Sequence, residues 1–209
     1  MNNDVICVIM AGGVGSRLRV SIEKPLINIL GKPMIEYIIT AVSKAKYVKD
    51  LYVATSPHTP RTEEYLRIKG INVIKTPGNG YVKDLRYVLN YVRHPHILVC
   101  PADTPLLSSE DVDLIVETYF KLRKPSLVVV IPLSLLNKLG ITPEYVMEIN
   151  GLHVAPCGIS VISRDTAIRK EILEEGYLIM RRTELALNVN TIRELKLAIN
   201  MLRNRNFSK

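Results

Sequence analysis

A glycine-rich loop, MAGGVGSRL at residues 10–18, directly follows the short apolar run VICVI at residues 5–9. A short apolar run that is bounded by glycine is consistent with a buried strand. Glycine has no Cβ, so backbone N–H groups in such a loop can come close to an anion. The chain therefore opens with a strand that leads into a candidate phosphate-binding loop.

Two standard nucleotide loops do not fit this stretch. A Walker loop requires GxxxxGK[ST], but Gly12 is followed five positions later by Arg17. A dinucleotide fingerprint requires GxGxxG, and Leu18 stands where its last glycine belongs. The second predicted strand ends in VATSP, without the acidic residue that this fingerprint expects. A different phosphate cradle is indicated.

Short β-branched runs alternate with amphipathic segments along the rest of the chain. The predicted strands are 4–10, 50–55, 71–75, 96–100 and 127–131. The predicted helices are 34–46, 62–69, 82–91, 110–123, 166–175 and 192–202. This alternation predicts one α/β domain over 1–209, with a mainly parallel sheet covered by helices on both faces. Residues 132–165 are richer in Pro and Gly and are expected to add an antiparallel piece or a lid.

Composition narrows the class of protein. Apolar residues make up 47% of the chain and charged residues 23%, as in globular proteins. The net charge of +8 attracts anions, and no basic run is interleaved with aromatic residues, which favours small phosphorylated substrates over nucleic acid. No signal peptide or membrane span is recognisable, so a cytoplasmic protein is expected. Cys7, Cys100 and Cys157 are expected to be buried thiols.

Two cations stand close to the glycine-rich loop. Arg17 offers a planar fork that suits phosphate oxygens, and Lys24 precedes Pro25, which stiffens the backbone beneath it. Together with the loop they predict a triphosphate cradle. The alternative is a tight turn with two solvated cations.

Further candidates follow later strands, because ligands of such sheets bind beyond the carboxyl ends of the strands. Asp103, in VCPADTPLL, is well placed to bind Mg2+ or, alternatively, to cap the turn before the next helix. In TPGNGYVKD, Gly78 and Gly80 allow backbone groups to face a purine. Asp84 can accept hydrogen bonds from guanine, or it is a first-turn residue of a helix. Gly158 allows close approach to the base or ribose, or marks a bulge.

The loop followed by EKPL at 23–26 resembles the signature of the MobA-like nucleotidyltransferases. The stretches 53–66, 75–89 and 148–162 make most of the chain similar to the archaeal adenosylcobinamide-phosphate guanylyltransferases within that family. The stretch TPGNGY departs from the Gln-rich base site of sugar-nucleotide pyrophosphorylases. The resemblance implies a Rossmann-like sheet of the nucleotide-diphospho-sugar transferase type. It also implies Mg2+ and transfer of GMP from GTP to adenosylcobinamide phosphate, with pyrophosphate released, in assembly of the cobalamin nucleotide loop.

The residue patterns and the resemblance together give the expected roles of individual residues. Nucleotide binding falls to Ala11, Gly12, Gly13, Gly15, Ser16, Gly78, Gly80, Asp84 and Gly158. Catalysis falls to Arg17, Lys24 and Asp103, with Arg17 nearer the β- and γ-phosphates and Lys24 nearer the α-phosphate or the acceptor. Asp103 holds the metal, and Asn188, in LNVNTIREL, is a weaker candidate ligand, while Asn190 or Thr191 caps the last helix.

The expected partners are GTP and adenosylcobinamide phosphate, with neither nucleic acid nor a membrane span, and a homodimer is left open. The acceptor is a phosphate monoester that is already ionised at neutral pH, so it needs no strong general base. Two alternatives stay open: a nucleotidyltransferase for molybdopterin or a sugar phosphate, and a nucleotide-binding module without catalysis.

Overall fold

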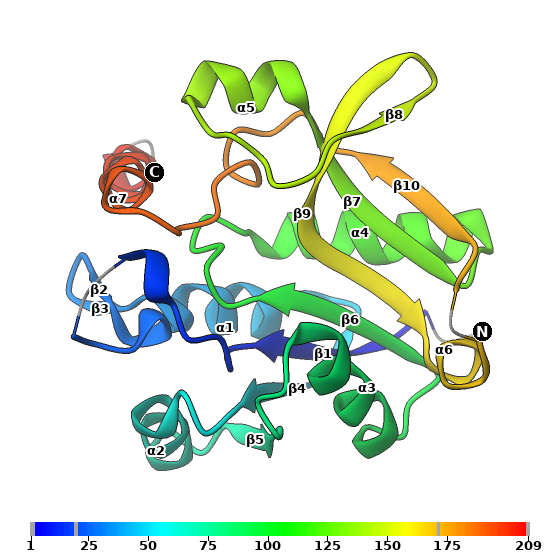
Figure 1. The fold of residues 1–209 in the computed structure, drawn as a ribbon, viewed down its shortest axis with the longest axis horizontal. Coiled ribbons are helices and arrows are strands. Elements are labelled where there is room, and N and C mark those ends of the chain that lie inside the picture. Colours follow the sequence, from blue (N-terminus) through cyan, green and yellow to red (C-terminus); the bar gives the residue numbers. More distant parts are fainter. Residues whose placement is uncertain (1–2, 19–20, 171, 208–209) are drawn as a thin grey trace.

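The main sheet is mostly parallel, as the sequence predicts. The computed structural model describes residues 3–18, 21–170 and 172–207, and within them the sheet has the order β10-β7-β9-β6-β1-β4-β5 (Figure 1). Its strands are β1 (Val5–Met10), β4 (Val48–Thr55), β5 (Asn72–Lys75), β6 (His96–Pro101), β7 (Ser126–Pro132), β9 (Leu152–Ser163) and β10 (Glu175–Ile179). Only β9 runs antiparallel to its neighbours along that described order, against β6 and β7. Short β8 (Met147–Ile149) pairs with β9, and β2 (Asn28–Ile29) and β3 (Lys32–Pro33) form a separate hairpin.

Helices cover both faces of this sheet. Their bounds are α1 (Met34–Lys44), α2 (Pro60–Ile68), α3 (Tyr81–Tyr91), α4 (Ser109–Leu122), α5 (Leu133–Leu139), α6 (Arg164–Arg169) and α7 (Ile192–Phe207). Buried side chains of α1, α2, α4 and α5 share one apolar cluster. On the other face, buried side chains of α3 and half-buried side chains of α6 pack into a second cluster. A third cluster joins α7 to the β2–β3 hairpin. This last cluster brings the end of the chain next to its first loop.

All six predicted helices and all five predicted strands are present, but the helix predicted at 166–175 is shorter. The helix there is Arg164–Arg169, and β10 begins at Glu175. Glu175 is extended because β10 pairs in parallel with β7, with Gly176 opposite Leu127. Residue 171 of the predicted helix lies outside the described residues.

The antiparallel piece expected within 132–165 is confirmed, but it is part of the main sheet and not an insertion at the edge of the fold. Strand β9 lies inside the sheet between β6 and β7. Its register against β7 shifts between Val128 and Val130, opposite Gly158, which has a positive φ of 86°. Gly158 thus lies in a bulge, and its contact with the base or the ribose stays a prediction.

Both capping patterns in the sequence are present. Ser108 and Asp111 form a capping box at the start of α4. Thr191 and Glu194 exchange equivalent hydrogen bonds at the start of α7. The three cysteines are free and buried, as expected. Among the helices of the described residues, none has both the length and the apolar character needed to cross a membrane.

Candidate active site

The loops that follow β1 and β6 lie side by side, because these two strands are parallel neighbours. The Ala11 N–H donates to the carbonyl of Ala54 at 2.8 Å, and the Ala102 N–H donates to the carbonyl of Met10 at 3.2 Å. The ladder therefore continues one residue beyond each strand and fixes where each loop begins. In Figure 1 the tips of β1 and β6 point toward the side where β2, β3 and α7 lie.

A polar cluster of Lys24, Asp103 and Asn190 lies at this edge of the sheet. The Lys24 ammonium donates to the Asp103 carboxylate and, at 2.7 Å, to Oδ1 of Asn190. The side chains of Lys24 and Asp103 are only 15% and 16% exposed. Partial burial strengthens an ion pair relative to one in open water. The structure thus brings Lys24 and Asp103 together, as the sequence predicts.

The backbone around Lys24 is held closely. Residues Lys24–Leu26 form a 3-10 turn, and Pro25 within it is buried. Gly15, with φ at 64°, packs against this turn, and a Cβ on Gly15 would lie 3.0 Å from the Cβ of Lys24. Any larger residue at position 15 would therefore be strained and would push Lys24 away.

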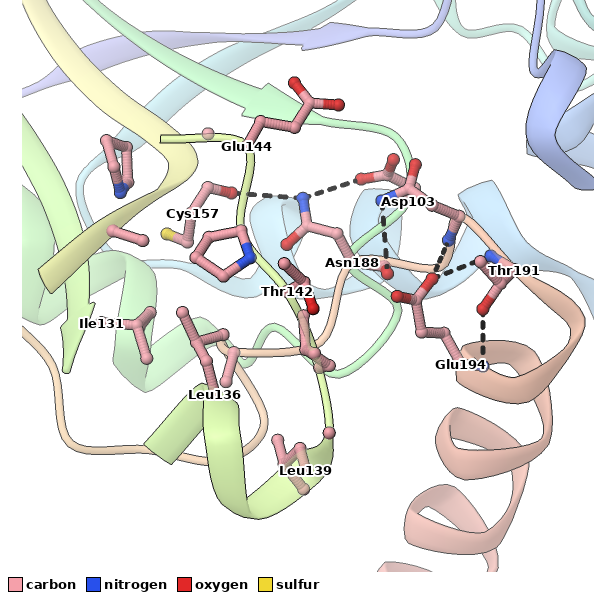
Figure 2. A pocket seen from close by; sticks show the side chains of 18 of the residues that line it. Asp103, Ile131, Leu136, Leu139, Thr142, Glu144, Cys157, Asn188, Thr191 and Glu194 are labelled. Atoms are coloured by element: carbon pink, nitrogen blue, oxygen red, sulfur yellow. Dashed lines mark hydrogen bonds between the residues drawn. The ribbon is translucent and has the colours of Figure 1, made fainter. Parts of the chain in front are cut away.

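Asp103 is held by the segment that precedes α7. The Val189 N–H donates to the Asp103 carbonyl at 2.8 Å, and Nδ2 of Asn188 donates to the Asp103 carboxylate at 3.1 Å. The same Nδ2 donates to the carbonyl of Cys157 at 3.3 Å, so Asn188 lies between two acceptors (Figure 2). This arrangement favours Asn188 as a residue that orients the carboxylate. Asp103 does not cap the following helix, because Ser108 does.

A cavity of about 290 Å³ lies over the glycine-rich loop. Its lining combines the loop backbone with the polar cluster: Ala11, Gly13, Gly15, Arg17, Lys24, Asp103 and Asn190 all contribute. Gly12 lies behind this surface, where a Cβ would come within 3.0 Å of Ser56 Cβ. The side chain of Ser16 lies outside the described part of the chain. The structure thus gathers most of the predicted triphosphate cradle around one small cavity.

A second cavity, of about 810 Å³, adjoins the same cluster. Leu136 and Leu139 of α5 and Ile131 of β7 line one side of it, while Thr191 and Glu194 line the α7 side (Figure 2). Gly158 and Asn188 line this cavity and not the smaller one. Burial raises the pKa of the Cys157 thiol in its wall to about 12, so this thiol is neutral near pH 7 and unsuited as a nucleophile. The larger cavity thus has apolar walls on the side of α5 and β7 and polar side chains on the side of α7.

Arg17 is placed between the two cavities and lines both. Its guanidinium forms an ion pair with Glu144, from the loop that follows α5. The two side chains are 62% and 76% exposed, so water screens the pair and its contribution to stability is small. Arg17 can therefore exchange Glu144 for another anion at little cost.

Gly78 and Gly80 lie in the loop before α3, and Asp84 lies in the first turn of that helix, as its structural alternative expects. Asp84 is buried, and one of its oxygens accepts from the N–H groups of Gly78 and Asn79 at 3.0 and 3.2 Å. Gly78 and Gly80 both have positive φ, at 75° and 100°. The geometry favours Asp84 as the residue that shapes this loop. Its direct contact with guanine stays a prediction.

A divalent metal fits the polar cluster. In the part of the chain that the structure describes, no group of three or more His, Cys, Asp or Glu side chains could hold a metal. Mg2+ needs few protein oxygens, because it keeps waters and binds substrate phosphates. Asp103 Oδ2 and Asn190 Oδ1 converge on one point, where they surround the Lys24 ammonium. Carboxylate and amide oxygens that already surround a cation are a suitable donor pair.

From the sequence, Asn190 was expected only as a possible cap of the last helix, and its contact with Lys24 was missed. The helix cap is Thr191, whose hydroxyl accepts from the Glu194 N–H at 3.2 Å, so the Asn190 side chain is free to reach Lys24. The N-x-N spacing in LNVNT was a signal for both asparagines. The packing of α7 decides which of the two asparagines reaches the Lys24 ammonium, and the local sequence does not show it.

Comparisons with known proteins agree with this geometry. Residues 7–134 match the MobA-like NTP transferase domain. The chain is 36% identical over 206 residues to the adenosylcobinamide-phosphate guanylyltransferase of Methanocaldococcus jannaschii, covering 94% of this chain and 96% of that protein. It is 32% identical over 115 residues to the bifunctional protein GlmU of Thermodesulfovibrio yellowstonii, of which the match spans only 25%.

Solved structures show the same fold. A CMP:2-keto-3-deoxy-manno-octonic acid synthetase complexed with CTP has a TM-score of 0.78 at 19% identity, covering 97% of this chain and 99% of that one. A putative glucose-1-phosphate thymidylyltransferase from Bacillus anthracis has a TM-score of 0.70 at 16% identity, covering 96% of each chain. The protein therefore has the Rossmann-like fold of the nucleotide-diphospho-sugar transferases.

Proposed function

Because the chain belongs to the MobA-like NTP transferase family, we propose that it transfers GMP from GTP to the phosphate of adenosylcobinamide phosphate and releases pyrophosphate. The observation that carries this proposal is that two cavities meet at one polar cluster. Arg17, Asp103 and Asn190 line both the smaller cavity and the larger one. A transferase with two substrates needs such a meeting point, because the reacting groups must be held in contact.

The small cavity suits the triphosphate of GTP. Backbone N–H groups of the loop 11–15 can face phosphate oxygens, and Lys24 and Arg17 add positive charge on the same side. In the free protein both cations are paired with carboxylates, Lys24 with Asp103 and Arg17 with Glu144. We expect the triphosphate to replace these carboxylates as the partner of each cation.

Asp103 and Asn190 are the residues that would hold a divalent metal, which nucleotidyltransferases of this family use. We propose Mg2+, since it prefers hard oxygen ligands and binds through phosphates. When bound, the ion would supply positive charge next to the phosphates. Asn188 would keep the Asp103 carboxylate oriented through its hydrogen bond of 3.1 Å.

In the reaction, an oxygen of the acceptor phosphate forms a bond to the α-phosphorus of GTP. The bond from that phosphorus to the oxygen that bridges to the β-phosphate breaks, and pyrophosphate leaves. The attacking oxygen is already ionised, so the site needs no general base, and catalysis depends on position and charge neutralisation. Lys24 lines the smaller cavity beside Asp103 and Asn190, where it can neutralise charge on the α-phosphate, and Arg17 can stabilise the charge that develops on the leaving pyrophosphate.

The larger cavity supports a bulky, largely apolar acceptor. Its volume of about 810 Å³ and its walls of Ile131, Leu136 and Leu139 suit a ligand that buries apolar surface. The phosphate of that ligand would enter on the side where Asp103 and Asn190 lie. A second candidate, a transferase for molybdopterin or a sugar phosphate, would leave these apolar walls largely unused.

The direct test uses GTP labelled at the α-phosphate with 32P, incubated with the protein, Mg2+ and adenosylcobinamide phosphate. We expect the label to move to the acceptor in step with pyrophosphate release, and the Asp103→Asn variant to show neither. Transfer of the label to molybdopterin or a sugar phosphate instead would favour the second candidate. GTP binding in a calorimeter without any pyrophosphate release would indicate a module without catalysis.

Three expectations from the sequence stay predictions: a single domain over residues 1–209, a cytoplasmic location and a homodimer. The structure describes one chain without partners. Analytical ultracentrifugation of the purified protein is the measurement that decides the oligomeric state.

A further inference from the structure

We infer that Glu23 is a positioning residue that holds the backbone of Lys24 in place for the triphosphate. Glu23 is the first residue of the stretch EKPL, but none of the roles expected from the sequence is assigned to it. The inference rests on the proposed function, because it assumes that Lys24 meets the nucleotide. It concerns how the chain fixes that lysine, and it can be tested by GTP binding alone.

Glu23 caps the start of α2 from a distant part of the chain. One of its carboxylate oxygens accepts from the Arg61 N–H at 2.8 Å. The other accepts from the Thr62 N–H at 2.6 Å and from the Thr62 hydroxyl at 2.5 Å. These N–H groups belong to the first turn of a helix that begins at Pro60, where they have no partner within the helix. A carboxylate is well suited to that position, because the N-terminus of a helix carries partial positive charge.

The residue just before the helix does not provide this cap. Thr59 makes no side-chain cap bond to α2 among the described residues. Its hydroxyl is used in the preceding turn, where it accepts from the Ser56 N–H at 3.2 Å. The first turn of α2 therefore depends on a side chain 38 to 39 positions earlier in the sequence. These long-range hydrogen bonds stabilise the start of α2, and they also hold the segment around Glu23 in place.

Because Lys24 is the next residue, anchoring Glu23 also restricts where the backbone of Lys24 lies. Glu23 is the residue from which the 3-10 turn Lys24–Leu26 starts. On the other side of Lys24, Pro25 is buried and the Met34 N–H donates to the Ile27 carbonyl at 2.8 Å. The lysine backbone is thus anchored on both sides, and Glu23 is the anchor that precedes it.

The same segment of the chain also holds the glycine-rich loop. The Ser56 hydroxyl donates to the Gly12 carbonyl at 2.7 Å. Residues 56–62 therefore form a common support that fixes the loop through Ser56 and the lysine segment through Glu23. Because both parts of the triphosphate cradle rest on one support, releasing Glu23 should move Lys24 relative to the loop.

The test is a double-mutant cycle between Glu23→Gln and Lys24→Met, read as the dissociation constant for GTP in a calorimeter. Asp113→Asn is the matched control, since Asp113 also accepts from two backbone N–H groups of a distant segment, those of Lys46 and Tyr47, at 2.7 and 3.3 Å. The control does not involve the candidate site. Melting temperatures of all variants report the structural part of each effect.

We expect Glu23→Gln to weaken GTP binding roughly 10-fold, because a displacement of about 1 Å is costly for a charged contact. In the Lys24→Met background the same change should alter binding less than about 2-fold, since a residue that acts through Lys24 has no effect without it. Asp113→Asn should lower the melting temperature and leave GTP binding unchanged.

Normal GTP affinity in a folded Glu23→Gln variant would overturn the inference, as would an equal loss of affinity in both backgrounds. If Glu23→Gln does not fold, Thr62→Val removes one of the three donors and should show the same dependence on Lys24, at roughly 3-fold. A protein that binds GTP with this dependence but transfers no GMP would contradict the proposed function and leave the inference intact.

Discussion

The two cavities that meet at Asp103 are built in different ways. The smaller one is lined by the glycine-rich loop, by the polar cluster of Lys24, Asp103 and Asn190, and by apolar residues that include Pro25 and Pro101. The larger one is lined by side chains of α5, β7, β9 and α7 and by loop residues before β8 and before α7. Arg17, Asp103 and Asn190 are common to both. One cavity thus suits a ligand with a fixed pattern of charge, and the other suits a ligand with extended apolar surface.

The supports behind the cavities differ as well. On the nucleotide side, hydrogen bonds from Ser56 to Gly12 and from Gly78 to Asp84 hold the loops by their backbones. On the acceptor side, the loop after α5 is held by Arg193, which donates to the carbonyl of Gly140 at 2.7 Å, and by the exposed ion pair of Glu144. The nucleotide side should therefore be sensitive to geometry, and the acceptor side more tolerant.

A substitution of Asp103, which lines both cavities, should lower the reaction rate more than any other change and should not separate the nucleotide side from the acceptor side. Asp103→Asn keeps the shape of the side chain but removes the charge that faces Lys24 and a metal. We expect pyrophosphate release to fall by about 1,000-fold at saturating Mg2+, as for the loss of a preorganised electrostatic contact. The assay follows pyrophosphate, with circular dichroism to show that the variant is folded. A rate near that of the native protein would remove Asp103 from the mechanism.

A change behind the nucleotide side should affect GTP alone. Asp84→Ala removes the acceptor of two backbone N–H groups, so the loop 78–80 loses its shape. We expect KM for GTP to rise roughly 10-fold, with KM for the acceptor unchanged.

The matched control is Asp84→Asn, which keeps an oxygen for the same N–H groups and should retain most of the GTP affinity. If Asp84→Asn instead abolishes the preference for GTP over ATP, Asp84 reads guanine directly. Steady-state kinetics with each nucleotide separate these two outcomes.

A change in the wall of the acceptor side should have a smaller effect, confined to the acceptor. Tyr145 is 60% exposed and lines the larger cavity, so Tyr145→Ala should cost little stability. We expect KM for adenosylcobinamide phosphate to rise about 5-fold through lost apolar contact, with KM for GTP unchanged. An equal rise in both KM values would contradict the division between the cavities.

The smallest effect on GTP binding is expected for the ion pair between Arg17 and Glu144, which joins the nucleotide side to the acceptor side. Glu144→Gln frees Arg17 from its carboxylate partner, so the triphosphate no longer has to displace it. We expect GTP to bind about 2-fold more tightly at low salt, and the difference to disappear at high salt because the pair is exposed. Titration calorimetry at two ionic strengths measures this. Weaker binding in the variant would show that Glu144 supports Arg17 rather than competing for it.

The sequence predicted the nucleotide side better than the acceptor side, for a physical reason. Gly15, Lys24 and Asp103 stand next to strands or to a proline, so local patterns indicate where they lie. The contact of Asn190 with Lys24 requires α7 to pack against the β2–β3 hairpin, which no local pattern encodes.

The same reason explains the errors elsewhere. The helix predicted at 166–175 extends too far, and its last residue, Glu175, instead begins β10, which pairs with β7. The segment 132–165 shows its antiparallel character in sequence only as Pro and Gly content, whereas its central place in the sheet depends on pairing with both β6 and β7. Pairing with strands that are distant in sequence decides where both β9 and β10 lie.

The most direct measurement is a crystal structure of the protein with Mg2+ and a GTP analogue that cannot be cleaved at the α-phosphate. The account predicts the triphosphate along the loop 11–15, with the Lys24 ammonium on a phosphate oxygen and the metal between Asp103 and Asn190. A polyphosphate bound elsewhere, with Lys24 still paired to Asp103, would contradict it.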